Sequence, residues 1–400
     1  MRKNAVNRQL KEIDGGICAP SGFYAGGIVC FGDNVSRETK ECLSLVMTDR
    51  RCPIACVYAD VKNVGAPSRV TKKNVKSGFA KAIIVNSGRA NVLGEKAEKD
   101  ALSICRALAK KAKICPDEVV IASTGKVGER FPVEQIVENI PVLYETLSSE
   151  GSKLSADMLV GGREGRQFSY SFEIGDTLCK IGGIFKGEKR VCPNMATTLC
   201  FVTTDVAISP EILQKSLRYA VGETFNLLNI DDIPSPNDFV CILSSGKAGN
   251  YKIERIDGDY EKFTYALTQT LRSVCKRIAK GDEEEMLTLC CKVEGARSKL
   301  SARVIAKSVV TASGIKKGIC DKSIAIEDIL YILQTSSEEK TPEKAEIRFI
   351  GKGEVVLYEE GRSIPLSRDI IERVLEENTI EIIIKLAGGN YGATAIGRLK

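Results

Sequence analysis

Two adjacent threonines, Thr197 and Thr198, stand at the entrance of an apolar run in the stretch VCPNMATTLCFVTTDVAISP, Val191 to Pro210. Forming a strand does not require such a pair. If the peptide bond after Ala196 is cut, Thr197 becomes a new amino terminus that carries both a hydroxyl and an α-amine. An α-amine with a pKa of about 7.7–8.0 can serve as a general base near neutrality. The pair is therefore either the plain start of a strand or an amino-terminal nucleophile that releases itself, and the residues alone leave both readings open.

The composition narrows the chemistry that is available. The 400 residues include no histidine, which excludes Ser-His-Asp and Cys-His catalysis and histidine-ligated zinc. The formal net charge of +6 is spread along the chain without a basic stripe, so we expect no nucleic-acid partner. The apolar runs are too short for a membrane span, and the charged opening residues predict no signal peptide. Fifteen cysteines then indicate reduced thiols in a cytoplasmic protein.

An acyl-transfer nucleophile also needs hydrogen-bond donors where the oxyanion forms. The segment ASTGKVG offers Thr124 and Gly125, a hydroxyl and an unobstructed backbone amide, at a turn after a predicted strand. Such a turn is common by itself and gains meaning only beside a nucleophile. The cysteine pairs, such as Cys290-Cys291, are expected in the core, and no metal site is predicted.

The elements around these residues predict an α+β fold. Strands are expected over 22–32, 55–61, 81–88 and 117–125, with a helix over 96–114 between the last two and another over 36–47. After residue 152 the pattern changes to paired strands, followed by the strand that begins at Thr197. A long amphipathic helix over 259–281 precedes further strands and helices. This order predicts sheets packed face to face with helices outside.

The stretch IGGIFKGEKRVCPNMATTLCFVTTDVAIS resembles the self-cleavage region of the ornithine acetyltransferases, the bifunctional glutamate N-acetyltransferases of arginine biosynthesis. Supporting segments, in the same order along the chain, are GGICAPSGFYAGGI, NSGRAN, ASTGKVGERFPVEQI, FNLLNIDDIPSPND and ARVIAKSVV. The resemblance implies a layered αββα sandwich of the N-terminal-nucleophile-like type with a smaller C-terminal α/β lobe. It also implies an α chain of residues 1–196 and a β chain of residues 197–400, with the lobe starting near residue 240.

The resemblance implies roles for individual residues. Thr197 would be the nucleophile, released by cleavage between Ala196 and Thr197, and Thr124 with Gly125 would form the oxyanion hole. Lys186 would bind the carboxylate of the substrate, and Glu283 its amino group. The acetyl group would pass from N-acetylornithine to glutamate without a cofactor, with acetyl-CoA as a further possible donor. The cleaved chains would assemble as α2β2.

Three departures from the family pattern keep other readings open. Residues 187–191 are more charged than the family's Gly-Ser-Gly-Met-Ile, and residues 160–163 replace a segment that donates a substrate-binding threonine. The family's chain also continues beyond the equivalent of Lys400 into a tail that reaches the substrate. The alternatives are a related amidohydrolase, an acyltransferase for a different acyl-amine, and a degenerate paralogue without catalytic activity.

Overall fold

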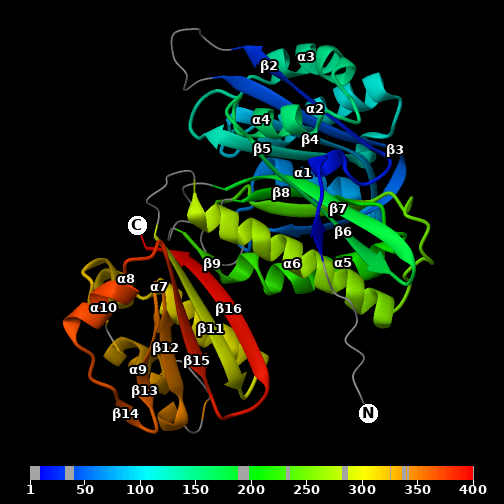
Figure 1. Ribbon diagram of the computed structural model, residues 1–400. Coiled ribbons are helices and arrows are strands. Elements are labelled where there is room, and N and C mark those ends of the chain that lie inside the picture. The colour runs from blue at the N-terminus through cyan, green and yellow to red at the C-terminus, as the bar shows by residue number, and fades with distance from the viewer. Residues whose placement is uncertain are drawn as a thin grey trace. The chain divides into compact units, whose positions relative to one another are not determined.

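The computed structural model describes residues 10–31, 40–187, 198–230, 235–281, 287–324, 326–335, 339 and 342–399 (Figure 1). The chain divides into two compact units. The first comprises the described parts of Met1–Gly187, Met195–Val221 and Pro234–Thr270, and the second those of Gly222–Ile233 and Leu271–Lys400.

The first unit is built on nine strands. Their order across the sheet is β1-β6-β7-β8-β10-β3-β4-β5, and β2 pairs with β3 from outside this path. The pairs β8–β10 and β4–β5 are parallel, and the others are antiparallel. The strands are β1 (Lys11–Glu12), β2 (Phe23–Phe31), β3 (Glu41–Tyr58), β4 (Phe79–Arg89), β5 (Val119–Lys126), β6 (Arg166–Ile174), β7 (Thr177–Lys186), β8 (Leu199–Thr204) and β10 (Phe239–Ser244).

The long strand β3 joins two sheet layers. Its first half pairs with β2 and β4, and its second half, from Ile54 to Tyr58, pairs with β10. The core between the layers combines side chains of β4 and β5 with Leu199 and Phe201 of β8 and Phe239 of β10. The two layers therefore face each other across a shared apolar core.

Helices cover the outer faces of both layers. A second core packs side chains of β3, β4 and β5 against α1 (Ala66–Asn74), α2 (Ala97–Ala112) and α3 (Val133–Glu145). On the other layer, Phe172 of β6 contacts Phe263 of α6 (Gly258–Lys280) with ring centroids 6.4 Å apart, and α5 (Pro210–Gly222) lies beside α6. The αββα sandwich that the sequence predicts is thus confirmed. A further helix, α4 (Ser152–Leu159), packs against β2 and β3.

Two sequence predictions are wrong in this unit. The helix expected over 36–47 is strand in its described part, because Leu43 and Leu45 enter one core while Val46 enters the other. A strand buried on both faces lacks the alternation of polar residues that identifies strands in a sequence. The C-terminal lobe does not start near residue 240, because β10 lies between β8 and β3 and residues 235–270 belong to the first unit.

The second unit is a smaller α/β layer structure, as expected. Its seven-stranded sheet has the order β14-β13-β12-β15-β11-β16-β9, with helices packed on an apolar core. The strands are β9 (Leu228–Asn229), β11 (Thr288–Ala296), β12 (Glu346–Ile350), β13 (Glu354–Glu359), β14 (Arg362–Ser363), β15 (Thr379–Lys385) and β16 (Tyr391–Arg398). The helices are α7 (Lys299–Thr311), α8 (Ser313–Cys320), α9 (Ile326–Thr335) and α10 (Arg368–Val374). Among the described helices of the whole chain, none is long and apolar enough to cross a membrane.

Candidate active site

A row of polar side chains crosses three strands of the first unit. Cys42 of β3 is the register partner of Ser87 of β4, and Ser87 is the register partner of Thr124 of β5. Residues directly opposite each other in a sheet project to the same face. Ser87 and Thr124 lie two residues after Val85 and Ala122, whose side chains belong to the core between the two layers. The row therefore projects into the space between the layers.

Lys186 reaches this row from the opposite layer. It is the last residue of β7, and its Nζ donates a long hydrogen bond of 3.5 Å to Oγ of Ser87. Ser87 therefore connects two predicted site residues: it accepts the hydrogen bond from Lys186, the predicted substrate-binding residue, and it is the register partner of Thr124, the predicted oxyanion residue. Lys186 is also the register partner of Leu199, the first residue of β8.

Gly125 lies in a strand and not in the expected turn. β5 continues to Lys126, and Gly125 is the register partner of Gly88 in β4. Gly125 has a φ of +134°, and a Cβ at this position would overlap the carbonyl oxygen of Gly88. Only glycine combines this conformation with so close an approach. The backbone amide of Gly125 is consequently held in one orientation by the neighbouring strand.

Two side chains of the segment before β10 fix the start of β8. Asp238 is 2% exposed, and interactions with the backbone N–H of Thr198 and the Ser235 side chain favour its charged form. The backbone N–H of the next residue, Phe239, donates to the carbonyl oxygen of Thr198 at 3.0 Å. Nδ2 of Asn237 donates to the carbonyl oxygen of Ser123, the residue before Thr124, at 3.0 Å. This segment therefore ties the residue after Thr197 and the residue before Thr124 to one support.

The buried carboxylate of Asp238 predicts a pH-dependent stability. Burial raises its pKa well above the ordinary value, because desolvation disfavours the charged form. The folded protein then holds this proton more tightly than the unfolded chain, so Asp238 reduces stability as the pH rises from about 4 towards the raised pKa. The reduction is at most about 1.4 kcal/mol per pH unit within that window.

We therefore expect Asp238→Asn to gain stability relative to the wild type as the pH rises from 5 to 8. The difference in the free energy of unfolding is measured by urea unfolding of both proteins at each pH, with both chains either cleaved or uncleaved between Ala196 and Thr197. A difference that is constant over this range would show that the proton of Asp238 is not held as the burial implies.

Three predicted residues lie outside the described part of the chain. They are Ala196 and Thr197 of the predicted cleavage site and Glu283 of the predicted substrate site. Thr197 is covalently joined to Thr198, whose carbonyl oxygen accepts a hydrogen bond from the backbone N–H of Phe239 at 3.0 Å.

The family model that describes the ArgJ family matches residues 31–398. The chain belongs to the ArgJ family.

Two relatives compared by sequence agree with this assignment, and one solved structure shows a partial likeness. The arginine biosynthesis bifunctional protein ArgJ of Bacillus licheniformis is 32% identical over 97% of this chain and 94% of its own length. The glutamate N-acetyltransferase of Methanopyrus kandleri is 30% identical over 95% of each chain. A crystal structure of ArgJ from Bacillus halodurans has 27% identity and a TM-score of 0.43, covering 47% of this chain and 98% of that one. As a member of the ArgJ family, this chain is an acyltransferase.

Cys42 does not compete as a nucleophile in this ArgJ-family chain. Burial, and then the charge of Glu41, raise the pKa of its thiol to about 11, so the reactive thiolate is scarce near neutrality. Within the described ranges, no group of three acidic or cysteine side chains could hold a metal ion.

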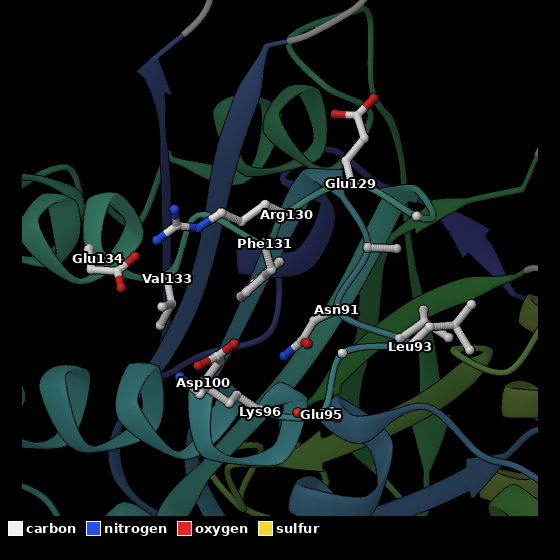
Figure 2. A pocket seen from close by; sticks show the side chains of 14 residues that line it. Asn91, Leu93, Glu95, Lys96, Asp100, Glu129, Arg130, Phe131, Val133 and Glu134 are labelled. Carbon is white, nitrogen blue, oxygen red and sulfur yellow. The ribbon is translucent and has the colours of Figure 1, made fainter.

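An open cavity of about 590 Å³ lies beside these strand ends in the same unit. Figure 2 shows Asp100 on α2 at one side and Arg130, Phe131 and Glu134 at the other. Burial, and then the charge of Glu134, raise the pKa of Asp100. Thr124, Gly125 and Lys186 do not line this cavity, so it is separate from the row described above.

Sequence reasoning missed Ser87, Asn237 and Asp238 as parts of this site. Their segments, NSGRAN and SPND, are visible as matches to the family, but nothing in them reveals which side chain meets which. Ser87 gains its place from the parallel register of β4 and β5, and Asp238 from the insertion of β10 next to β8.

Proposed function

We propose that this chain is a self-cleaving acetyltransferase of arginine biosynthesis, which moves an acetyl group from N-acetylornithine to glutamate through an ester on Thr197. The observation that supports the proposal is the convergence of Lys186, Ser87 and Thr124 at one end of the strands, next to the start of β8. The relatives' names, arginine biosynthesis bifunctional protein and glutamate N-acetyltransferase, support the pathway and glutamate as the acceptor. N-acetylornithine as the donor rests on the family resemblance.

Cleavage is the first step of the proposed mechanism. Oγ of Thr197 attacks the carbonyl carbon of Ala196, the C–N bond breaks, and the amine of Thr197 takes up the proton. Water then hydrolyses the resulting ester. Residues 1–196 end in a carboxylate, and Thr197 carries a free α-amine that can act as a general base.

Acetyl transfer follows in two half-reactions. The α-amine of Thr197 removes the proton from its own Oγ, which attacks the acetyl carbonyl of N-acetylornithine. The Thr124 hydroxyl and the Gly125 amide donate hydrogen bonds to the oxyanion. The C–N bond breaks, and ornithine leaves with the proton. The amine of glutamate then attacks the ester, Thr197 regains its proton, and N-acetylglutamate is released.

The remaining residues bind and orient the substrate in this proposal. The Lys186 ammonium pairs with the substrate carboxylate, and Glu283 with its amino group. No cofactor takes part; acetyl-CoA is a second donor that the same oxyanion site would accept. The enzyme works in the cytoplasm as an α2β2 assembly of cleaved chains.

One observation favours a second candidate, an acyltransferase or amidohydrolase for a different acyl-amine. Gly161 and Gly162 stand in the segment where the family resemblance implies a substrate-binding threonine. A Cβ at Gly161 would lie 3.8 Å from Oγ of Ser87, and one at Gly162 3.8 Å from Sγ of Cys42. The chain thus presents two glycines beside the row and no hydroxyl, which changes the shape and polarity that a substrate meets there.

Product analysis separates these candidates. The purified protein is incubated with N-acetylornithine, with and without glutamate, and the products are measured by mass spectrometry. We expect ornithine and N-acetylglutamate in equal amounts, formed only with glutamate and with ping-pong kinetics. Acetate formed without an acceptor would identify an amidohydrolase. An uncut chain that makes none of these products would contradict the proposal and favour a degenerate paralogue.

A further inference from the structure

The carboxylate of Glu41 is completely buried at the start of β3. Its Oε1 accepts a hydrogen bond from Nδ2 of Asn86 at 2.8 Å, and its Oε2 accepts one from the backbone N–H of Arg89 at 3.0 Å. Nη1 of Arg89 lies 3.8 Å from Oε2. Both oxygens act as acceptors of N–H groups, which a carboxylate satisfies and a side-chain amide does not.

These hydrogen bonds fix the C-terminal end of β4 from one face of the sheet. Side chains alternate between the faces of a sheet, so Glu41 and Asn86 project to the face opposite the row of Cys42, Ser87 and Thr124. Gly88 lies against the carboxylate, because a Cβ there would overlap Oε2 of Glu41. The segment Asn86–Arg89 is therefore clamped at both ends by one side chain.

The clamped segment, Asn86–Arg89, contributes Ser87 to the row of Cys42, Ser87 and Thr124. Ser87 is the register partner of Thr124 and accepts the hydrogen bond from Lys186, and Gly88 is the register partner of Gly125. A displacement of the segment would move the carbonyl oxygen of Gly88, against which the backbone of Gly125 packs. Through these two contacts Glu41 reaches both oxyanion donors without touching the substrate.

The burial of Glu41 is unfavourable for stability. Desolvation raises its pKa, and the hydrogen bonds from Asn86 and Arg89 offset this effect in part. A buried charge is costly unless it is fully paired, and apolar groups often replace such charges without loss of stability. A charge at this position thus has no evident advantage for folding alone.

We propose that Glu41 is a positioning residue of the acyl-transfer reaction. Its carboxylate fixes Ser87 and Gly88 from the face of the sheet opposite the row of Cys42, Ser87 and Thr124, and so sets the positions of the oxyanion donors Thr124 and Gly125. The inference rests on the proposed function, since it assigns Glu41 to the same site. Placing oxyanion donors correctly affects the transition state more than the bound substrate, so kcat and not KM should respond.

The test compares Glu41→Gln with Asp205→Asn in the purified, full-length protein. Asp205 is a matched control at the opposite end of β8; it is 3% exposed, and its carboxylate accepts the backbone N–H groups of Lys180 at 2.7 Å and Ser21 at 3.3 Å. We expect Glu41→Gln to lower kcat by about 10- to 100-fold with KM within about twofold. Asp205→Asn should keep the wild-type kcat, even if its unfolding midpoint falls by as much or more.

The possible outcomes separate this inference from the proposed function. A wild type that makes no N-acetylated product would refute the proposed function itself. An active wild type with an unchanged kcat in Glu41→Gln, or an equal kcat loss in both variants, would overturn the inference. If Glu41→Gln does not fold, the same measurement is made on Glu41→Asp. The shorter side chain keeps the charge but reaches only one of the two donors, so kcat should fall to between about 10% and 100% of the wild-type value. An unchanged kcat in Glu41→Asp would overturn the inference.

Discussion

Replacing Thr197 by alanine is expected to leave a single uncut chain of 43.5 kDa and to abolish acetyl transfer. The hydroxyl is the only group that can attack the carbonyl of Ala196 in the proposed mechanism, and the free α-amine arises only through that attack. A chain without histidine offers no imidazole to replace this base. One substitution therefore removes the nucleophile, the base and the cleavage together.

Intact mass spectrometry of the purified protein measures this directly. The wild type should give two fragments that break between Ala196 and Thr197, and Thr197→Ala should give one mass. Thr198→Val is the matched control: its hydroxyl is buried and has no hydrogen-bond partner in the described chain, so cleavage should persist. Two fragments from Thr197→Ala, or one chain from the wild type, would contradict the proposed nucleophile.

Replacing Gly125 by alanine is expected to lower kcat by about 10²–10³-fold, the loss typical of one oxyanion donor. The added Cβ would overlap the carbonyl oxygen of Gly88, so the two strands must separate and the Gly125 amide must turn. The φ of +134° adds strain for any residue with a side chain. Since Gly125 lies near the end of β5, the change should disturb the site more than the core.

Gly249→Ala is the control for backbone strain. Gly249 has a φ of +93°, but a Cβ there meets nothing within 4 Å. Steady-state kinetics and thermal unfolding of both variants separate the effects: both should lose some stability, but only Gly125→Ala should lose most of its kcat. A Gly125→Ala enzyme with near wild-type kcat would show that this amide does not stabilise the oxyanion.

Much of the fold could be predicted because local pattern and tertiary environment agree. The helix α2 shows its buried face in the spacing of Ala101, Cys105 and Leu108, and the paired strands β6 and β7 are evident from their alternation and from the turn between them. The prediction failed at Glu41–Met47, where β3 is buried on both faces. There the apolar run is compatible with helix or strand, and only the neighbours β2 and β4 decide.

The candidate site divides in the same way. Residue chemistry made Thr197 a candidate nucleophile and Thr124 with Gly125 candidate donors, because an absent histidine leaves few ways to activate a hydroxyl, and the family resemblance then selected them. Lys186 and Glu283 came from the family resemblance. The structure brings Lys186 and Thr124 together through Ser87, while Thr197 and Glu283 stay predictions.

The sequence by itself determined the layered α+β class, because this depends on periodicities within single segments. It determined the family, with its acyl-transfer chemistry and αββα architecture, through motifs that resemble those of the ornithine acetyltransferases. Only the tertiary structure decided which side chains share the site. Ser87, Asp238 and Glu41 are separated by tens of residues from their partners, and strand register brings them into contact. Glu41 shows the difference most clearly: within SRETKE it has the character of a solvent-exposed charge, and folding buries it completely. Register and burial are properties of strand pairing over long distances, which no local pattern encodes.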